Sequence, residues 1–189
     1  MKGAIRAFIG IILTPEMKNE LSQVQSELKE AGADVKWVKP ASIHLTLKFL
    51  GDISTQKVAD VKKVLDLASS RHKAFEMTLF KIGCFPKMDH PRVIWVGIDR
   101  GCSQAESLAK TIDDELGSIG FQIEARPYTA HLTLGRVRSP KSREGLVSKI
   151  KTLDFSPCAT SHSDKLTLFQ STLTPQGSIY TPLYEAKLS

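Results

Sequence analysis

Two histidine and threonine pairs recur in this sequence with the same neighbours. The tetrapeptide His-Leu-Thr-Leu occupies positions 44–47 and again 131–134, and each copy begins four residues after a proline that follows a cation. An imidazole takes up and releases protons near neutral pH, and a hydroxyl donates hydrogen bonds to phosphate oxygens. These residue types predict acid–base chemistry at an anionic group.

Both copies alternate leucine with a polar residue, which is typical of a half-buried β-strand. Residues two apart lie on one face of a strand, so His44 and Thr46 should point away from the core, as should His131 and Thr133. One such pair by itself is typical of the exposed face of any strand. Two copies indicate a site, because core packing does not require the polar pair to recur.

Two imidazoles with pKa values near 6.5 can hold one neutral and one protonated member at neutral pH. Concerted general base and general acid catalysis needs that combination, while hydroxyls and cations hold the non-bridging oxygens of a phosphoryl group. The set suits in-line attack of water on a phosphodiester without a covalent intermediate. Neither motif carries a further ligand on the same face, so we expect no metal and no other cofactor.

Two cations are further candidates for substrate contacts. Lys48 lies an even number of residues after His44, so both should point to the same face of a regular strand. Arg136 lies an odd number of residues after His131, so in a regular strand the two would point to opposite faces. Arg136 reaches the face of His131 only if a bulge or twist at Gly135 redirects it.

Cations and aromatic residues near the motifs leave two readings open. The cations after the second motif indicate either a solvated face or a track for an RNA backbone, and they are Arg136, Arg138, Lys141, Arg143, Lys149 and Lys151. The aromatic side chains could stack a base or fill the core, and they are Tyr128, Trp37, Trp95 and Phe85. We select Tyr128 from this group as a candidate substrate contact.

The same order of elements is predicted in both halves of the chain. The first half reads as a strand 5–13, a helix capped by Thr14, a short strand 34–38, the motif strand 43–50 ended by Gly51, a helix capped by Ser54 or Thr55 and a strand 75–82. After a loop at 83–91, the second half reads as a strand 93–98, a helix from 103, a short strand 121–123, the motif strand 131–137, a helix near 140–150 and a strand 165–170. A final strand at 178–185 has no counterpart.

The predicted fold class is α+β, with a duplicated, bilobal architecture in one domain spanning 1–189. The repeats, approximately 1–85 and 90–172, should each form a lobe with an antiparallel sheet and flanking helices. A pseudo-two-fold axis would then bring the two polar motif faces together across a central cleft.

Composition places the chain among ordinary globular proteins. It has 189 residues, a net charge of +6 and three widely spaced cysteines, which fit neither a disulfide framework nor a zinc ribbon. The apolar run at 8–13 is too short to cross a membrane. We therefore expect a cytoplasmic monomer without a membrane partner, and its basic charge favours a polyanionic partner.

The motifs and their flanks resemble the 2H phosphoesterase superfamily, in particular its RNA 2′,3′-cyclic phosphodiesterase branch, also called 2′-5′ RNA ligase. The likeness runs nearly end to end. It rests on Trp-Val-Lys-Pro at 37–40, HLTLKFLG at 44–51, Pro-Arg-Val-Ile-Trp at 91–95, Arg-Pro-Tyr-Thr-Ala-HLTLGRV at 126–137 and Leu-Phe-Gln-Ser at 168–171.

This resemblance implies hydrolysis of a terminal RNA 2′,3′-cyclic phosphate to a 2′-phosphate without metal, with tRNA fragments among the candidate substrates. It implies that His44 donates a proton to the departing 3′ oxygen and that His131 activates water. Thr46, Thr133 and Arg136 are implied phosphate contacts. Three alternatives stay open: 2′-5′ RNA ligation, a non-catalytic RNA-binding module, and a phosphodiesterase for a small cyclic nucleotide or ADP-ribose cyclic phosphate.

Overall fold

The computed structural model describes residues 4–175 and 177–189. In chain order its elements are β1 (Ala4–Ile12), α1 (Pro15–Lys29), β2 (Val35–Trp37), a 3-10 turn (Pro40–Ser42), β3 (His44–Ser54), α2 (Thr55–Arg71), β4 (Phe75–Lys87), β5 (His90–Ile98), α3 (Cys102–Ser118), β6 (His131–Val137), α4 (Arg143–Thr152), β7 (Thr160–Ser163), β8 (Lys165–Thr174) and β9 (Gly177–Lys187).

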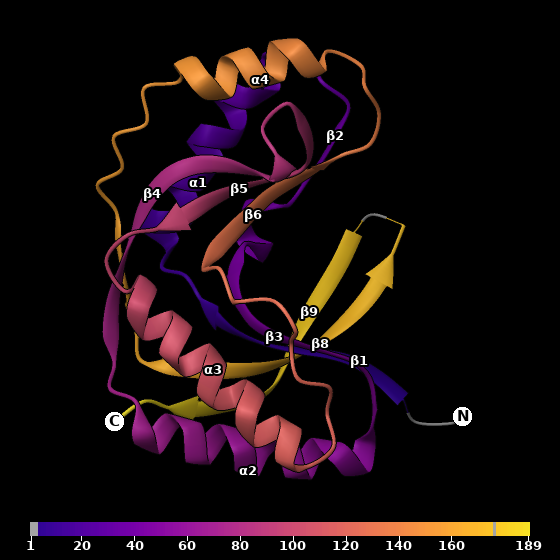
Figure 1. Cartoon of the computed structure of the whole chain (residues 1–189), viewed down its shortest axis with the longest axis vertical. Helices are drawn as coiled ribbons and strands as arrows, with labels where there is room; N and C mark the ends of the chain where they lie inside the picture. Colours follow the sequence, from indigo (N-terminus) through magenta and orange to yellow (C-terminus); the bar gives the residue numbers. More distant parts are fainter. Residues whose placement is uncertain (1–3, 176) are drawn as a thin grey trace.

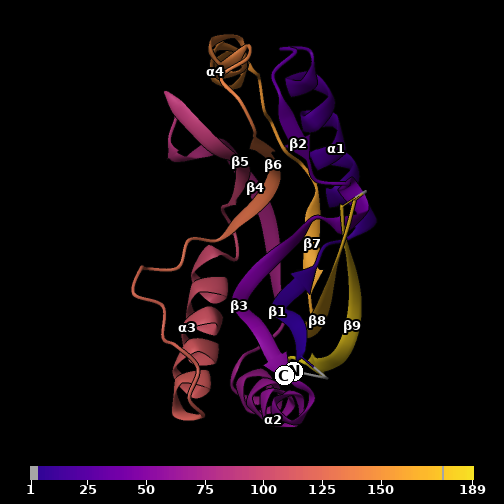
Figure 2. The same cartoon turned by 90° about the vertical axis from the view of Figure 1, so that its right-hand side faces the viewer.

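The strands form two antiparallel sheets. One has the order β3-β1-β8-β9 and the other the order β2-β6-β5-β4-β7. Figures 1 and 2 place α4 and α2 at opposite ends of the long axis, with the five-stranded sheet toward α4 and the four-stranded sheet toward α2. The two motif strands, β3 and β6, therefore belong to different sheets, in an α+β fold as predicted.

Local sequence signals explain where the first two helices begin. Thr14 caps α1 by accepting a hydrogen bond from the Met17 backbone N–H at 3.4 Å, and Pro15 occupies the first helical position. Ser54 caps α2 in the same way through the Lys57 N–H at 3.3 Å. The Thr14 cap lies where the sequence predicts it, and Ser54 is one of the two residues, with Thr55, that the sequence offers as the cap of the second helix.

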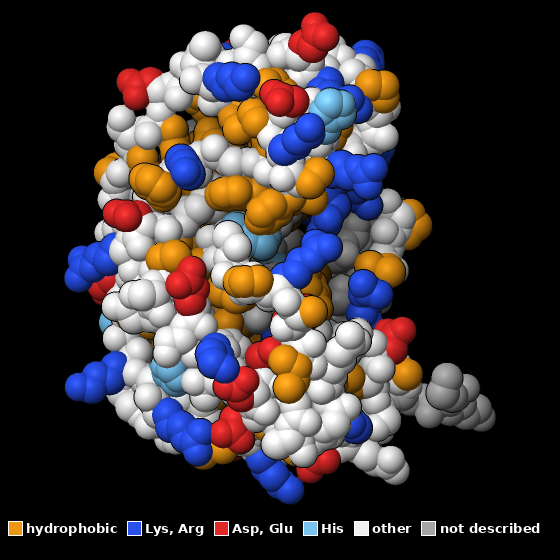
Figure 3. Space-filling model, viewed as in Figure 1, with side chains coloured by type: hydrophobic (Ala, Val, Ile, Leu, Met, Phe, Trp, Pro, Cys, Tyr) orange, Lys and Arg blue, Asp and Glu red, His pale blue; other side chains and the backbone are white. Residues whose placement is uncertain are grey.

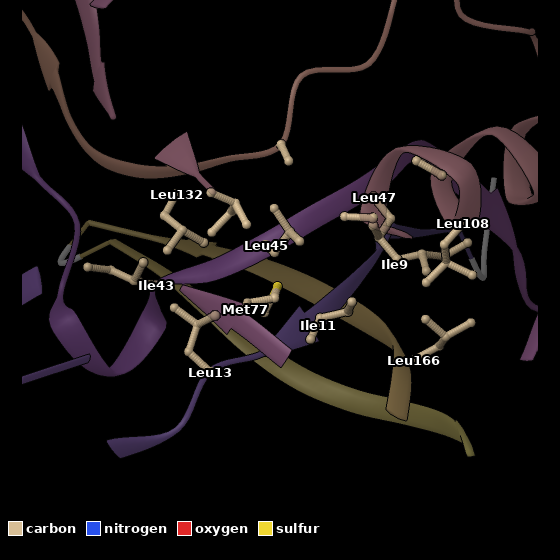
Figure 4. Close-up of a cluster of buried hydrophobic side chains, with 14 of the residues drawn as sticks. Ile9, Ile11, Leu13, Ile43, Leu45, Leu47, Met77, Leu108, Leu132 and Leu166 are labelled. Carbon is tan, nitrogen blue, oxygen red and sulfur yellow. The ribbon is translucent and has the colours of Figure 1, made fainter. Parts of the chain in front are cut away.

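The leucines of both motifs are part of one hydrophobic core. Leu45 and Leu132 are fully buried, and Figure 4 shows them in a cluster with Ile9 of β1, Met77 of β4 and Leu108 of α3. Burying such side chains stabilises the fold by about 1.5 to 3 kcal/mol each. The leucine faces thus hold the motif strands in place and leave the histidine faces directed away from the core.

The sheets do not follow the boundaries of the two repeats, which corrects the predicted lobes. β2 and β4 come from the first repeat, yet they pair with β6 and β5 of the second. In return β8, from the second repeat, pairs with β1 and leads into β9 at the sheet edge. Each lobe is built from segments of both halves of the chain.

Three other predicted features differ from the structure, and one strand was not predicted. The 83–91 loop is instead the tip of a hairpin, because β4 runs on to Lys87 and β5 begins at His90. Gly83 is needed for packing, since a Cβ there would lie 2.3 Å from the Trp95 ring. Gly51, with φ of +69°, sits in β3 at a register shift and does not end the strand. Residues 121–123 form no strand, and β7 was not predicted.

Candidate active site

His44 begins β3 and is held by its own backbone and by aromatic neighbours. Its Nδ1 lies 2.8 Å from the carbonyl oxygen of Ser42. The ring stacks on Phe8 with centroids 4.6 Å apart, and Tyr180 meets it edge-on at 5.0 Å. Gly10 of β1 leaves room for this ring, because a Cβ there would lie 3.3 Å from His44 Cδ2 and 2.7 Å from the Leu45 oxygen.

His131 begins β6 and repeats this arrangement in the other sheet. Its Nδ1 lies 2.7 Å from the carbonyl oxygen of Thr129, again two residues before the histidine. Phe85 packs edge-on against the ring at 5.1 Å, and Trp95 lies 6.2 Å away. Both imidazoles are half-buried, and each is held through Nδ1 by the carbonyl oxygen two residues before it.

The carbonyl contacts determine which ring nitrogen is available for chemistry. A carbonyl oxygen only accepts hydrogen bonds, so Nδ1 of each histidine carries a proton and donates it to Ser42 or Thr129. Nε2 is then the atom that can accept or release a catalytic proton. In His44 this Nε2 lies 3.0 Å from the Thr46 hydroxyl, so the first histidine and threonine are in direct contact.

Burial lowers the pKa of both histidines below their usual 6.5. For His44 burial is the main cause; the Ser42 hydrogen bond opposes it and the Lys18 charge adds to it. For His131 burial again comes first, opposed by the Thr129 hydrogen bond and reinforced by the Arg136 charge. Both imidazoles are therefore mainly neutral at pH 7 before an anion binds.

Matching bulges follow the threonine of each motif. In the β1–β3 ladder Ile9 pairs with Lys48 and Gly10 with Thr46, which leaves Leu47 as the extra residue. In the β5–β6 ladder Ile94 pairs with Gly135 and Trp95 with Thr133, which leaves Leu134 as the extra residue. Two consecutive residues then face the core, and strand parity changes at the same place in both repeats.

The second bulge brings Arg136 to the catalytic face. Leu134 and Gly135 are both buried, and Arg136 emerges exposed on the side of His131, whose pKa its charge depresses. This is the redirection at Gly135 that Arg136 needs in order to share the face of His131.

The first bulge takes Lys48 away from that face, which corrects its predicted role. Lys48 is only 4% exposed. Its Nζ lies 2.5 Å from Asp113 Oδ1 of α3, 2.8 Å from the Gln122 carbonyl oxygen and 3.2 Å from Glu124 Oε1. The ammonium is fully engaged within the protein, so Lys48 joins β3 to α3 and to the segment before the second motif.

The hydroxyl of Tyr128 is engaged within the protein. Its hydroxyl donates a hydrogen bond to the Thr46 carbonyl oxygen at 2.8 Å. Burial, assisted by the charges of Cys102 and Glu106, raises the pKa of this phenol strongly, so it stays protonated. Tyr128 thus connects the approach to the second motif with the first motif strand.

The other aromatic candidates take two different places. Trp37 packs against the core, whereas Phe85 and Trp95 are half-buried beside His131, with their ring centroids 5.1 Å apart. Sequence reasoning missed Phe49, which follows the first bulge at the position equivalent to Arg136 and is 62% exposed. The signal was available, because each residue lies five positions after its histidine.

No group of three or more His, Cys, Asp or Glu side chains in the described residues is arranged to hold a metal ion. Within residues 4–175 and 177–189, no helix has the length and apolar character needed to span a membrane.

Comparisons with known proteins agree with this duplicated architecture. The family model for LigT-like phosphoesterases matches the chain twice, at residues 11–95 and 96–180. An RNA 2′,3′-cyclic phosphodiesterase of Methanothermobacter thermautotrophicus is 34% identical over 179 residues, covering 95% of this chain and 96% of that protein. A protein of the same name from Thermotoga maritima is 33% identical over 184 residues, covering 97% and 95%.

Solved structures share the fold at lower sequence identity. The protein TT0787 of Thermus thermophilus superposes with a TM-score of 0.81 at 22% identity, covering 97% of this chain and 98% of that one. E. coli LigT complexed with 3′-AMP gives 0.78 at 24% identity, covering 98% and 99%. With two family matches that together span residues 11–180 and end-to-end relatives above 30% identity, this chain belongs to the LigT-like phosphoesterase family of 2H phosphoesterases.

Proposed function

We propose that this protein hydrolyses RNA ends that carry a 2′,3′-cyclic phosphate, leaving a 2′-phosphate, without a metal ion. The observation that carries the proposal is the pair of equivalent imidazoles, each anchored through Nδ1 and each offering Nε2. The names of the relatives supply the substrate class.

In this mechanism His131 Nε2 accepts a proton from water while the oxygen of that water forms a bond to phosphorus. The bond from phosphorus to the 3′ oxygen breaks, and the protonated Nε2 of His44 donates its proton to that oxygen. Thr46, Thr133 and Arg136 donate hydrogen bonds to the non-bridging oxygens as charge builds there. The two histidines end with their protonation states exchanged, so one proton transfer through solvent resets the site.

The exposed ring of Phe49 adds a surface suited to the terminal nucleoside. It lies at the edge of the aromatic cluster around His44, with its centroid 6.0 Å from that of Phe8. Bases stack on exposed aromatic rings without regard to sequence. This arrangement favours a nucleoside cyclic phosphate over a cyclic phosphate without a base.

Phosphorus NMR tests the proposal directly. The EDTA-treated protein is incubated with a short RNA ending in a 2′,3′-cyclic phosphate, and conversion to the 2′-phosphate is the expected result. A 3′-phosphate product would show that the other ester bond breaks and would reverse the roles of the histidines. Bound RNA without conversion would instead identify a binding module, and a joined product in the presence of a 5′-hydroxyl RNA would identify ligation.

The pH profile follows from the two lowered pKa values. Activity falls at high pH as His44 loses the proton it must donate, and falls at low pH as His131 gains a proton and stops accepting one. Because both pKa values lie below 6.5 in the free protein, we expect kcat/KM to peak below pH 6.5.

A bound phosphate anion stabilises imidazolium, so the peak of kcat should lie at higher pH than that of kcat/KM. Arg136→Gln removes a charge that lowers the His131 pKa, and should move the acid limb of kcat/KM to higher pH. A peak of kcat/KM well above pH 7 would contradict this account of the site.

A further inference from the structure

Two cations face each other across the edge of the five-stranded sheet. Lys36 of the edge strand β2 lies directly opposite Arg136 of β6, and both residues are exposed. Like charges in directly opposed positions destabilise a sheet. Within residues 4–175 and 177–189, neither cation forms an ion pair with a carboxylate. The two cations are therefore available to bind an anion.

The surrounding contacts show which way Lys36 points. Its neighbours Val35 and Trp37 lie on the other face of β2, where a Cβ on Gly135 would be 2.6 Å from Val35 Cγ1 and 3.0 Å from Trp37 Cε3. Helix α1 covers that other face, since the buried Gln25 of α1 donates hydrogen bonds to the Val38 and Leu134 carbonyl oxygens at 2.7 and 2.8 Å. Lys36 thus shares the open face with Arg136.

This face continues from the catalytic site toward the sheet edge. The Arg136 charge reaches His131, and Lys36 lies one strand farther out, about 4.8 Å away at the backbone. Figure 3 shows Lys and Arg side chains gathered beside the histidine near the middle of the surface. Because Lys and Arg side chains are long and flexible, these two cations can contact two successive phosphates of one RNA strand.

We infer that Lys36 binds the phosphodiester next to the terminal cyclic phosphate, so that the site prefers an oligoribonucleotide end over a cyclic mononucleotide. The inference rests on the proposed function. Arg136 then contacts the reacting phosphate and Lys36 the internucleotide phosphate on its 5′ side. An edge-strand lysine can also serve only to discourage strand pairing between molecules, and the experiment separates these roles.

The test compares kcat/KM for two substrates in the wild type and in Lys36→Gln. A nucleoside 2′,3′-cyclic monophosphate lacks the second phosphate, whereas a dinucleotide ending in the same cyclic phosphate has it. We expect Lys36→Gln to lower kcat/KM about tenfold for the dinucleotide at low salt, and to leave the mononucleotide unchanged within about twofold. Lys36→Arg should retain the wild-type preference.

Two controls make the comparison specific. The wild type should hydrolyse a dinucleotide with a neutral methylphosphonate link about as slowly as Lys36→Gln hydrolyses the normal dinucleotide. Lys36→Gln should hydrolyse the methylphosphonate dinucleotide no more slowly than the wild type does. Lys63→Gln, which removes an equal charge from the exposed face of α2, should behave as wild type. Equal losses on both substrates, or no loss on the dinucleotide, would overturn the inference. A wild type inactive on both substrates would overturn the proposed function itself.

Discussion

Replacing His44 or His131 with alanine is expected to lower kcat by about 10² to 10⁴-fold with little change in KM. In the proposed mechanism each Nε2 moves a proton in the transition state and contributes little to binding the substrate. The two variants should also differ in their pH profiles. His44→Ala should lose the alkaline limb, because the proton donor is gone, and His131→Ala should lose the acid limb.

His162→Ala is the matched control. This histidine is exposed and pairs with Glu76 of the neighbouring strand at 2.7 Å, remote from both motifs in the sequence. We expect its activity to stay within about twofold of wild type, since removing an exposed pair has little effect on the fold. Unfolding curves should confirm that all three variants are folded. Full activity in His44→Ala or His131→Ala would refute the two-histidine mechanism.

Lys48→Met should destabilise the protein by about 3 kcal/mol, the largest effect we expect from a change outside the site. The substitution leaves Asp113, which is 16% exposed, and the Gln122 carbonyl oxygen without their cation. Breaking such a buried pair costs about 3 to 5 kcal/mol. We expect a loss at the lower end of this range because Glu124 is 62% exposed, so water can hydrate its carboxylate once the lysine is removed. Urea denaturation measures this through the midpoint at constant m-value.

Two further variants identify the cause of that loss. Adding Asp113→Asn to Lys48→Met should restore part of the stability, because it removes the unpaired charge. Lys63→Met breaks an exposed pair with Asp60 at 3.6 Å and should change stability by less than about 0.5 kcal/mol. If Lys48→Met unfolds at the wild-type midpoint, the ammonium and its three partners contribute nothing net to stability.

Local signals in the sequence predicted the positions of many strands and helices of this molecule. The second motif strand was placed at 131–137, its observed bounds, because alternation is a property of adjacent residues. The caps at Thr14 and Ser54 likewise depend only on the residues that follow them. The pairing of β2 with β6 was not predicted, because it joins distant parts of the chain and leaves no local pattern.

One prediction at the site, that of Lys48, is wrong for a physical reason. Even spacing places Lys48 on the face of His44, and odd spacing leaves Arg136 off the face of His131 unless a bulge redirects it; a bulge after each threonine reverses both positions. The partners of Lys48 come from α3 and the segment after it, more than sixty residues away, so its burial could not be inferred locally. The hydrogen bond of Tyr128 was not predicted for the same reason, since its acceptor is a backbone oxygen of the other motif.

The exchange of strands between the repeats has a consequence for synthesis on the ribosome. When the first half of the chain has emerged, β1 and β3 can pair, but β8 and β9 have not yet been made. The edge of β1 that β8 covers in the folded protein therefore stays unpaired until the segment from Lys165 onward has been made. A ribosome paused before that point holds a chain with an unpaired strand edge, which makes such a chain prone to aggregate.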